Sequence, residues 1–426
     1  MSVRRNIVAN YLGAGISALA PILALPWYVS ILGPKQWGLI SFIALLQGLL
    51  GLLNTGLSQA LVREFAEKVA EKKKMAILLF GFERIYWIFA IVAALLMIIT
   101  AGLIAKYWLK LDNFPKGTGE LVVCCAAAIF AVQFPVSIYR SVLMGCGEQI
   151  KQNIFLTIGI LLKHVGGVVV VVIYKSIEAY LLWSVLAAFM ETVLTAHSSW
   201  GVLGIKRSEI GWDFAAMKKV FALSLGLSTS VLLGVLTMQM DKIVLSWSLP
   251  IEQLGYYSIA SAVALGSLQL FNPISSAVLP KIVQSRLQVG VLRKLNVKLF
   301  LIMLGLVGLS IIGFLLVGKQ LLNLWLRDTH LVNVIYPIIE VLLIGTGFNA
   351  LYNVGYMNWL AEGSTSKIFR VNVVALVLSV ILIPLLITKY GLVGAAFGWL
   401  VINSVGLLLS LDWIFNRGAV NAQNVT

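Results

Sequence analysis

Apolar residues in this chain occur in blocks of about 20, the length an α-helix needs to cross the ~30 Å hydrocarbon core of a bilayer. A segment in lipid must satisfy its backbone hydrogen bonds internally, and at this length only a helix does so. Hydrophobic residues make up 60% of the 426 residues and charged residues only 12%, too few to cover a water-soluble protein of this size. The sequence therefore predicts an all-α integral membrane protein.

The hydropathy pattern predicts about twelve membrane-spanning helices. They form two groups of six, residues 1–203 and 220–426, joined by a basic connector at residues 204–219. Two such bundles around a central cavity are a common architecture of transporters. The predicted spans are 7–30, 37–62, 76–105, 120–146, 150–173, 177–202, 220–246, 254–280, 298–318, 334–360, 367–387 and 391–415.

The basic residues predict the orientation of these spans. Most of the 32 Lys and Arg residues fall on the side of the N-terminus when the spans alternate. Cytoplasmic loops carry this excess, so both termini are expected in the cytoplasm. The net charge of +15 is then an orientation signal with contacts to anionic membrane lipid, and no nucleic-acid partner is expected.

The two halves show weak internal similarity at a nearly constant offset. The segments "QWGLIS" (36–41) and "QLGYYS" (253–258) are 217 positions apart. Further matches recur at an offset of 216, which predicts a duplicated bundle. These pairs are Tyr174/Tyr390, Ala179/Ala395, Trp183/Trp399, Gly147/Gly363 and Lys151/Lys367.

Three stretches resemble one family of transporters. They are "SILGPKQWGLISF" after the first span, "LLNTGLSQALVREFA" at the end of the second, and "MDKIVLSWSLPIEQLGYYSIA" between the seventh and eighth. The chain is similar in these motifs, in length and in span number to the polysaccharide and O-antigen (Wzx-type) flippases of the multidrug/oligosaccharidyl-lipid/polysaccharide exporter superfamily. The matching positions are Leu32, Gly33, Trp37, Gly38, Asn54, Gly56, Leu57, Arg63, Asp241, Gly255 and Tyr256.

The resemblance implies a flippase of the bacterial inner membrane. Such a protein moves an undecaprenyl-pyrophosphate-linked oligosaccharide from the cytoplasmic to the periplasmic leaflet, and other polysaccharide-assembly proteins are possible partners. Asn54 departs from the family pattern, because many relatives carry an Asp there. A role for an acid at this position is therefore in doubt.

Four basic residues inside the spans are candidates for binding an anionic headgroup: Arg84, Arg140, Lys163 and Lys242. A charge in the bilayer core is costly, so it usually faces a bundle interior or an aqueous cavity. Fixed cations can replace the hydration of a pyrophosphate with charge-assisted hydrogen bonds. The alternative for Arg84 and Arg140 is contact with lipid phosphates at the interface.

Three acidic residues are candidates for coupling transport to a proton or sodium gradient: Asp241, Glu191 and Glu340. A buried carboxylate beside a basic residue can exchange a cation as its surroundings change. The alternatives are structural. Glu191 could pair with Lys163, and Asp241 or Glu340 could neutralise Lys242.

No pattern in the sequence predicts catalysis. We find no metal-ligand cluster, no nucleophile with a base and no glycine loop for phosphate, so neither an enzyme nor a cofactor is expected. The alternatives to a flippase are a multidrug and toxin exporter of the same superfamily, a membrane glycosyltransferase or polymerase, and a scaffold of a polysaccharide assembly complex. Short outer loops argue against the enzymes.

The acidic and basic stretch "REFAEKVAEKKK", residues 63–74, is typical of an amphipathic helix at the membrane interface. In that interpretation Phe65 and Val69 point toward lipid. The stretch would lie between the second and third spans.

Overall fold

The computed structural model describes residues 3–69, 71–109, 111, 114–205, 210–286 and 288–415. Every regular element in these ranges is helical, which confirms the predicted all-α class. The chain forms two compact units. The N-terminal unit comprises Met1–Leu232 with Leu249–Gly255, and the C-terminal unit comprises Leu233–Ser248 with Tyr256–Thr426. The predicted connector at 204–219 lies partly outside the described residues, and its role as the domain boundary stays a prediction.

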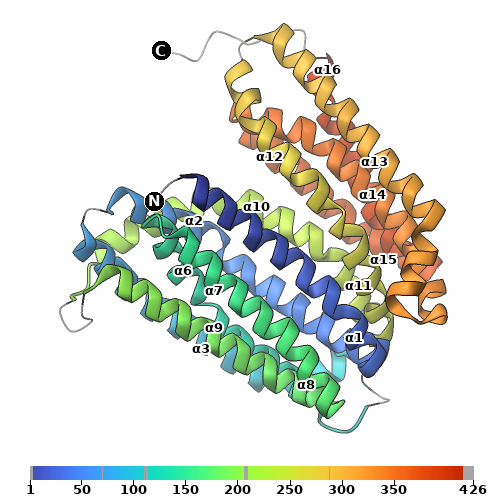
Figure 1. Cartoon of the computed structure of the whole chain (residues 1–426), viewed down its shortest axis with the longest axis horizontal. Helices are drawn as coiled ribbons and strands as arrows, with labels where there is room; N and C mark the ends of the chain where they lie inside the picture. The colour runs from blue at the N-terminus through green and yellow to red at the C-terminus, as the bar shows by residue number, and fades with distance from the viewer. Residues whose placement is uncertain are drawn as a thin grey trace. The chain divides into compact units, whose positions relative to one another are not determined.

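The helices of the N-terminal unit run side by side and are drawn from blue to green in Figure 1. Short 3-10 and π-helical turns join several of them. The elements are α1 (Val3–Gly51), η1 (Leu52–Asn54), α2 (Thr55–Glu67), α3 (Lys72–Ile99), α4 (Ala101–Leu103), η2 (Ile104–Leu109), α5 (Thr118–Gln133), α6 (Val136–Gly145), α7 (Gln149–Leu161), η3 (Leu162–Gly166), α8 (Gly167–Tyr174) and α9 (Ile177–Leu203).

A long helix, α10 (Phe214–Ser248), contributes residues to both units. The C-terminal unit continues with helices drawn from yellow to red in Figure 1. They are α11 (Ile251–Gly266), whose residues up to Gly255 belong to the N-terminal unit, α12 (Leu268–Ser285), α13 (Val289–Leu326), α14 (Thr329–Glu362), α15 (Thr365–Ser410) and α16 (Asp412–Phe415).

Nine helical segments in the described part of the chain have the length and hydropathy of membrane spans. Two of them, Gly13–Gly51 and Thr365–Ile414, each cover a pair of predicted spans. Both contain a break in the helix, at Gly33 (φ 78°) and at Gly391 (φ 59°). Glycine adopts such positive φ values without steric strain, so the chain can reverse direction at these two residues.

Several predicted spans are interrupted rather than continuous, among them the second and the fourth. The second changes to a 3-10 turn at Leu52–Asn54, and the fourth is divided between α5 and α6 around Pro135. Proline has no backbone N–H and its ring clashes with the preceding turn, so the helix cannot continue regularly through it.

The turns of the structure recur at the offset seen in the sequence. Gly147 (φ 75°) follows α6 and Gly363 (φ 71°) ends α14, and the two are 216 positions apart. Lys175 (φ 48°) ends α8 and matches the break at Gly391, again at 216. A positive φ recurs at both pairs of equivalent positions, which supports the predicted internal repeat.

The matching glycines Gly38 and Gly255 lie in a reciprocal contact between α1 and α11. A Cβ atom on Gly38 would lie 2.1 Å from the carbonyl oxygen of Ile251, and one on Gly255 would lie 2.2 Å from that of Pro34. Pro34 and Ile251 are themselves equivalent in the repeat, 217 positions apart. Only glycine allows the backbones to approach this closely.

One hydrophobic core of the N-terminal unit includes residues of α2, α3, α6 and the start of α10. Phe65 is fully buried in it, against Gly145 of α6. The predicted interfacial helix over 63–74 is therefore wrong, because α2 ends at Glu67 and a new helix begins at Lys72. The local pattern of charges predicts a surface helix. It cannot show that residues distant in the sequence cover the ring of Phe65.

Candidate functional site

A cavity of about 630 Å³ lies within the N-terminal unit, among α2, α6, α7, η3 and α9. Figure 1 shows α2, α6, α7 and α9 as neighbouring helices of this unit. We call it the N-terminal cavity. Its polar and charged lining residues are Ser58, Gln59, Gln133, Ser137, Arg140, Ser141, Gln152, Lys163, His164 and Glu191.

Arg140 and Glu191 form an ion pair in the wall of this cavity. Arg140 projects from α6 just after the Pro135 break, and Glu191 comes from the middle of α9. Glu191 is 7% exposed, and Gln133 donates a further hydrogen bond to its other oxygen at 3.4 Å. The carboxylate is therefore held by groups from the two pieces of the interrupted fourth span.

Gly159 of α7 makes room for the Glu191 side chain. A Cβ atom at this position would lie 2.5 Å from Cδ and 2.7 Å from Oε2 of Glu191. Real Cβ atoms do not approach other atoms so closely, so a larger residue would displace the carboxylate. Gly159 thus fixes where Glu191 can lie relative to Arg140.

Lys163 and His164 lie in the π-helical turn Leu162–Gly166, which separates α7 from α8. Trp183 donates a hydrogen bond to the Leu162 carbonyl at 2.8 Å, and the Tyr28 hydroxyl donates one to the His164 carbonyl at 2.8 Å. A π turn disturbs the regular helical hydrogen bonds, and these side-chain donors satisfy the carbonyls. Such turns are frequent at functional sites.

Within the described residues, the Lys163 ammonium has no carboxylate within 4.0 Å, although Glu191 lines the same cavity. The alternative pairing of Lys163 with Glu191 is therefore replaced by the pair of Arg140 with Glu191. Nδ1 of His164 is buried and has no hydrogen-bond partner in that part of the chain. Lys163 therefore offers a cation to a cavity that can hold a polar ligand, whereas the unsatisfied His164 nitrogen is covered by protein atoms.

Asn54 connects three helices beside this cavity. Its amide nitrogen donates to the Ser137 hydroxyl and to the Phe134 carbonyl (3.3 Å), and its oxygen accepts from the Tyr86 hydroxyl at 2.7 Å. An amide can donate and accept at once, which a carboxylate cannot. The departure from the family pattern at this position therefore suits a structural role.

Arg84 is not among the residues that line the N-terminal cavity. It is exposed on α3, and its guanidinium stacks on Phe80 (3.9 Å to the ring centroid) and on Trp212 (5.5 Å). Sequence position alone groups Arg84 with Arg140, but only Arg140 lines the cavity. Its surroundings suit the alternative, a contact with lipid phosphate at the interface.

The other three candidates belong to the C-terminal unit. Asp241 is 5% exposed and accepts hydrogen bonds from the Tyr257 hydroxyl (2.7 Å) and from the backbone N–H of Lys242 (2.7 Å). Glu340 lies beside Tyr336 on α14. Among the described residues, Lys242 forms no ion pair with Asp241 or Glu340 within 4.0 Å, so the structural alternative of a neutralising pair is not found.

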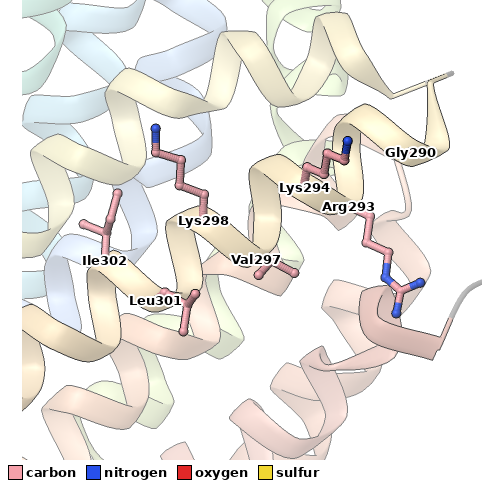
Figure 2. Close-up of a pocket in the computed structure, with 7 residues that line it drawn as sticks. All are labelled: Gly290, Arg293, Lys294, Val297, Lys298, Leu301 and Ile302. Atoms are coloured by element: carbon pink, nitrogen blue, oxygen red, sulfur yellow. The ribbon is translucent and has the colours of Figure 1, made fainter.

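A second hollow of about 730 Å³ lies on one face of α13. Figure 2 shows Lys294 and Lys298 directed to the same side of the helix, with Arg293 pointing the other way. Val297 lies between Lys294 and Lys298, and Leu301 and Ile302 continue the apolar lining beyond Lys298. An open apolar face edged by cations is typical of a helix at the membrane interface, next to anionic lipid.

Polar residues of the N-terminal cavity were not all predictable. His164, Gln133, Gln152, Ser58 and Ser137 carry no motif, and a polar residue in a span packs between helices more often than it binds a ligand. The signals that could have found them are the Pro135 break next to Gln133 and the clustering of two basic residues at 163–164.

The helical segments and the cavity with charged lining residues define a multi-pass membrane protein of the transporter type. In the described residues, no group of His, Cys, Asp or Glu is placed to hold a metal ion. The sequence matches the family model described as "Polysaccharide biosynthesis protein" over residues 3–286. The match covers more than half of the chain, so the chain belongs to this family.

Comparisons over the full length agree with that membership. The "Putative O-antigen transporter" of Shigella flexneri is 24% identical over 422 residues, covering 98% of each chain. Among solved structures, the lipid II flippase MurJ in an inward closed conformation has a TM-score of 0.75 at 14% identity, covering 96% of this chain and 87% of MurJ.

A multidrug resistance MATE family transporter of the MOP superfamily, in an inward-facing conformation, gives a TM-score of 0.74 at 14% identity, covering 97% of this chain and 100% of that chain. At this level of identity, the likeness to MurJ and to the MATE transporter shows the fold. The chain therefore has the fold of the superfamily that the sequence motifs resemble.

Proposed function

We propose that this protein is a flippase for a lipid-linked oligosaccharide. Its substrate is an undecaprenyl-pyrophosphate-linked repeat unit, which it moves from the cytoplasmic to the periplasmic leaflet of a bacterial inner membrane by alternating access. The observation that carries the proposal is the N-terminal cavity, with an unpaired Lys163 in a polar wall. Family membership and the name of the Shigella flexneri relative support it.

The charges of the cavity favour an anionic ligand. Glu191 is neutralised by Arg140, which leaves the Lys163 ammonium as the uncompensated charge. A half-buried cation without a partner is costly, and a phosphate oxygen would satisfy it with a charge-assisted hydrogen bond. Gln133, Gln152 and the serine hydroxyls can donate to phosphate or sugar oxygens.

Arg140 can link binding to an ion gradient. A pyrophosphate in the cavity competes with Glu191 for the Arg140 guanidinium, whose planar fork binds phosphate well. Glu191 is 7% exposed, and without Arg140 its carboxylate would keep only the Gln133 hydrogen bond and the more distant Lys163 ammonium. That state is strongly unfavourable, so Glu191 takes up a proton when Arg140 turns to the substrate. We propose a proton, rather than sodium, because the site offers a single carboxylate.

The test of function is deletion of the gene in its host. Lipid-linked repeat units are expected to accumulate facing the cytoplasm, and surface polysaccharide is expected to disappear. Normal surface glycan in the deletion strain would refute the proposal. Increased sensitivity to organic cations with normal glycan would instead favour the multidrug exporter.

Complementation with variants tests the cavity. Lys163→Ala is expected to reduce export at least roughly tenfold, since a charge-assisted hydrogen bond contributes about 1.5–3 kcal/mol. Lys151→Ala is the matched control, because Lys151 is exposed on the preceding helix and pairs with Glu148. Full export by the Lys163→Ala variant at normal expression would remove this residue from the binding site.

The role of Glu191 requires transport in proteoliposomes with and without a pH gradient. Glu191→Gln keeps the shape and the Gln133 contact but cannot exchange a proton. It is expected to equilibrate substrate between leaflets without responding to the gradient. A variant that is accelerated by the gradient as strongly as the wild type would show that Glu191 is not the coupling group.

A further inference from the structure

The π-helical turn Leu162–Gly166 carries Lys163, the cation on which the proposed function depends. Such a turn holds one residue more than an α-helical turn, so some of its backbone carbonyls lose their regular N–H partners. An α-helix advances about 100° per residue, so closing the turn would rotate the residues on one side of it relative to those on the other. The place of Lys163 in the cavity therefore depends on what keeps the turn open.

Two aromatic side chains from other helices bind the carbonyls of this turn. Trp183 of α9 donates from Nε1 to the Leu162 carbonyl at 2.8 Å. The Tyr28 hydroxyl of α1 donates to the His164 carbonyl at 2.8 Å and lies 3.4 Å from the Lys163 carbonyl. The carbonyls before, at and after Lys163 thus face donors from two neighbouring helices.

Packing holds the same two rings against the turn. A Cβ atom on Gly166 would collide with the indole of Trp183, and one on Gly167 would collide with the Tyr28 hydroxyl. The Tyr28 side chain is fully buried, and its ring stacks on Trp37 with 5.8 Å between centroids. Two adjacent glycines therefore let the donors reach the backbone, and burial keeps Tyr28 there.

The second copy of the predicted repeat has a regular helix at the equivalent place. At the offset of 216, the π turn corresponds to residues 378–382, which lie within the helical part of α15 before its break at Gly391. Ser379 stands at the position of Lys163, and its hydroxyl donates to the Ala375 carbonyl one turn earlier at 2.6 Å. The copy without the lysine thus has no π turn at this position.

The two donors are also changed in that copy. Trp399, the equivalent of Trp183, donates instead to the Thr346 hydroxyl at 3.3 Å. At the offset of 217 that relates Gln36 to Gln253, the position of Tyr28 is taken by Leu245, whose side chain has no donor. The lysine, the π turn and both hydrogen bonds to it therefore occur together in the first copy.

We propose that Tyr28 and Trp183 are positioning residues that hold the π turn open and thereby keep Lys163 in the N-terminal cavity. Both side chains lie outside the set that lines this cavity, so they act through the backbone of the turn. What Lys163 binds rests on the proposed function, whereas the geometry of the turn does not.

The first test measures the position of residue 163 directly. Lys163→Cys is made in the full-length chain with its three native cysteines replaced by serine, and its rate of reaction with a water-soluble methanethiosulfonate reagent is followed. Combining Tyr28→Phe with Trp183→Phe is expected to lower this rate at least roughly fivefold, because the turn loses both hydrogen bonds. Gln152→Cys lines the same cavity from α7, before the turn, and is expected to keep its rate.

Matched controls make this test specific. Tyr174→Phe and Trp27→Phe remove the same chemical groups from exposed rings and should leave the rate at residue 163 unchanged. Tyr28→Phe alone keeps the ring in place and should lower the rate in the same direction as the double variant. An unchanged rate at residue 163 in the double variant would refute the proposal. Equal losses at residues 152 and 163 would also refute it, because they would show a general loss of structure.

The second test measures export in the deletion strain. Tyr28→Phe is expected to reduce export by the wild-type chain but to cause no further loss in a Lys163→Ala background, since Tyr28 acts through Lys163. Independent losses from the two changes would refute that link. If the labelling rates respond as expected while the deletion strain keeps normal surface glycan, the positioning proposal stands and the proposed function fails.

Discussion

Replacing Gly159 by alanine tests how tightly the N-terminal cavity positions its acid. The added methyl group would lie 2.5 Å from Cδ of Glu191, whereas ordinary contacts begin at 3.4 Å. The carboxylate must therefore retreat by about 0.9 Å, away from α7. Such a shift disturbs its hydrogen bonds to Arg140 and Gln133, which come from two other helices.

The expected loss of stability is moderate. Overpacking of a well-packed site costs about 1–3 kcal/mol, and the change from glycine to alanine in a helix returns up to about 1 kcal/mol. We therefore expect Gly159→Ala to lower the free energy of unfolding by about 1–2 kcal/mol. Gly201→Ala in α9 is the control, since no atom lies within 4 Å of an added Cβ there.

A double-mutant cycle separates this steric effect from others. Unfolding is measured by titrating mixed micelles with SDS and following tryptophan fluorescence. In a Glu191→Ala background the methyl group at position 159 has nothing to displace, so Gly159→Ala should be neutral or stabilising. The coupling between the two changes is expected to exceed about 1 kcal/mol. If Gly159→Ala is as stable as Gly201→Ala, the carboxylate does not pack on this glycine and the assignment of the site fails.

Two further predictions concern other close contacts. Asp241→Ala should destabilise the protein by about 1–3 kcal/mol, because it leaves the buried Tyr257 hydroxyl without its acceptor. In a Tyr257→Phe background the same change should cost less. Additive losses of stability in SDS unfolding would contradict this prediction. Gly38→Ala should abolish folded expression or export, because the methyl group would lie 2.1 Å from a backbone carbonyl that cannot move aside. Gly51→Ala, with nothing within 4 Å, should behave as wild type, and normal export by Gly38→Ala would rule out the tight crossing.

The contact between α1 and α11 at Gly38 and Gly255 supports the internal repeat. In the sequence, the segments around Gly38 and Gly255 are a short match that could arise by chance. In the structure Gly38 packs against the backbone carbonyl of Ile251, and Gly255 packs against that of Pro34. Pro34 and Ile251 are equivalent positions of the two copies. The four residues belong to the N-terminal unit, and their pairing adds a structural observation to the sequence match.

The sequence by itself determined the class of this protein. Blocks of apolar residues and the scarcity of charge allow only membrane helices, because backbone groups in lipid must be satisfied within their own segment. The left-handed turns at Gly147 and Gly363 and the break at Pro135 are likewise local, and each follows from one residue and its neighbours. Membership of the polysaccharide family was also readable from local motifs.

The tertiary structure alone decided which charges meet. Glu191 pairs with Arg140, 51 residues earlier, and not with Lys163, because the close approach of α7 at Gly159 and the break before α6 fix the directions of these side chains. Depth along a span cannot reveal its rotation or its neighbours. For the same reason Arg84 lies outside the N-terminal cavity: electrostatic partners are chosen by helix packing over long sequence distances, which no local pattern encodes.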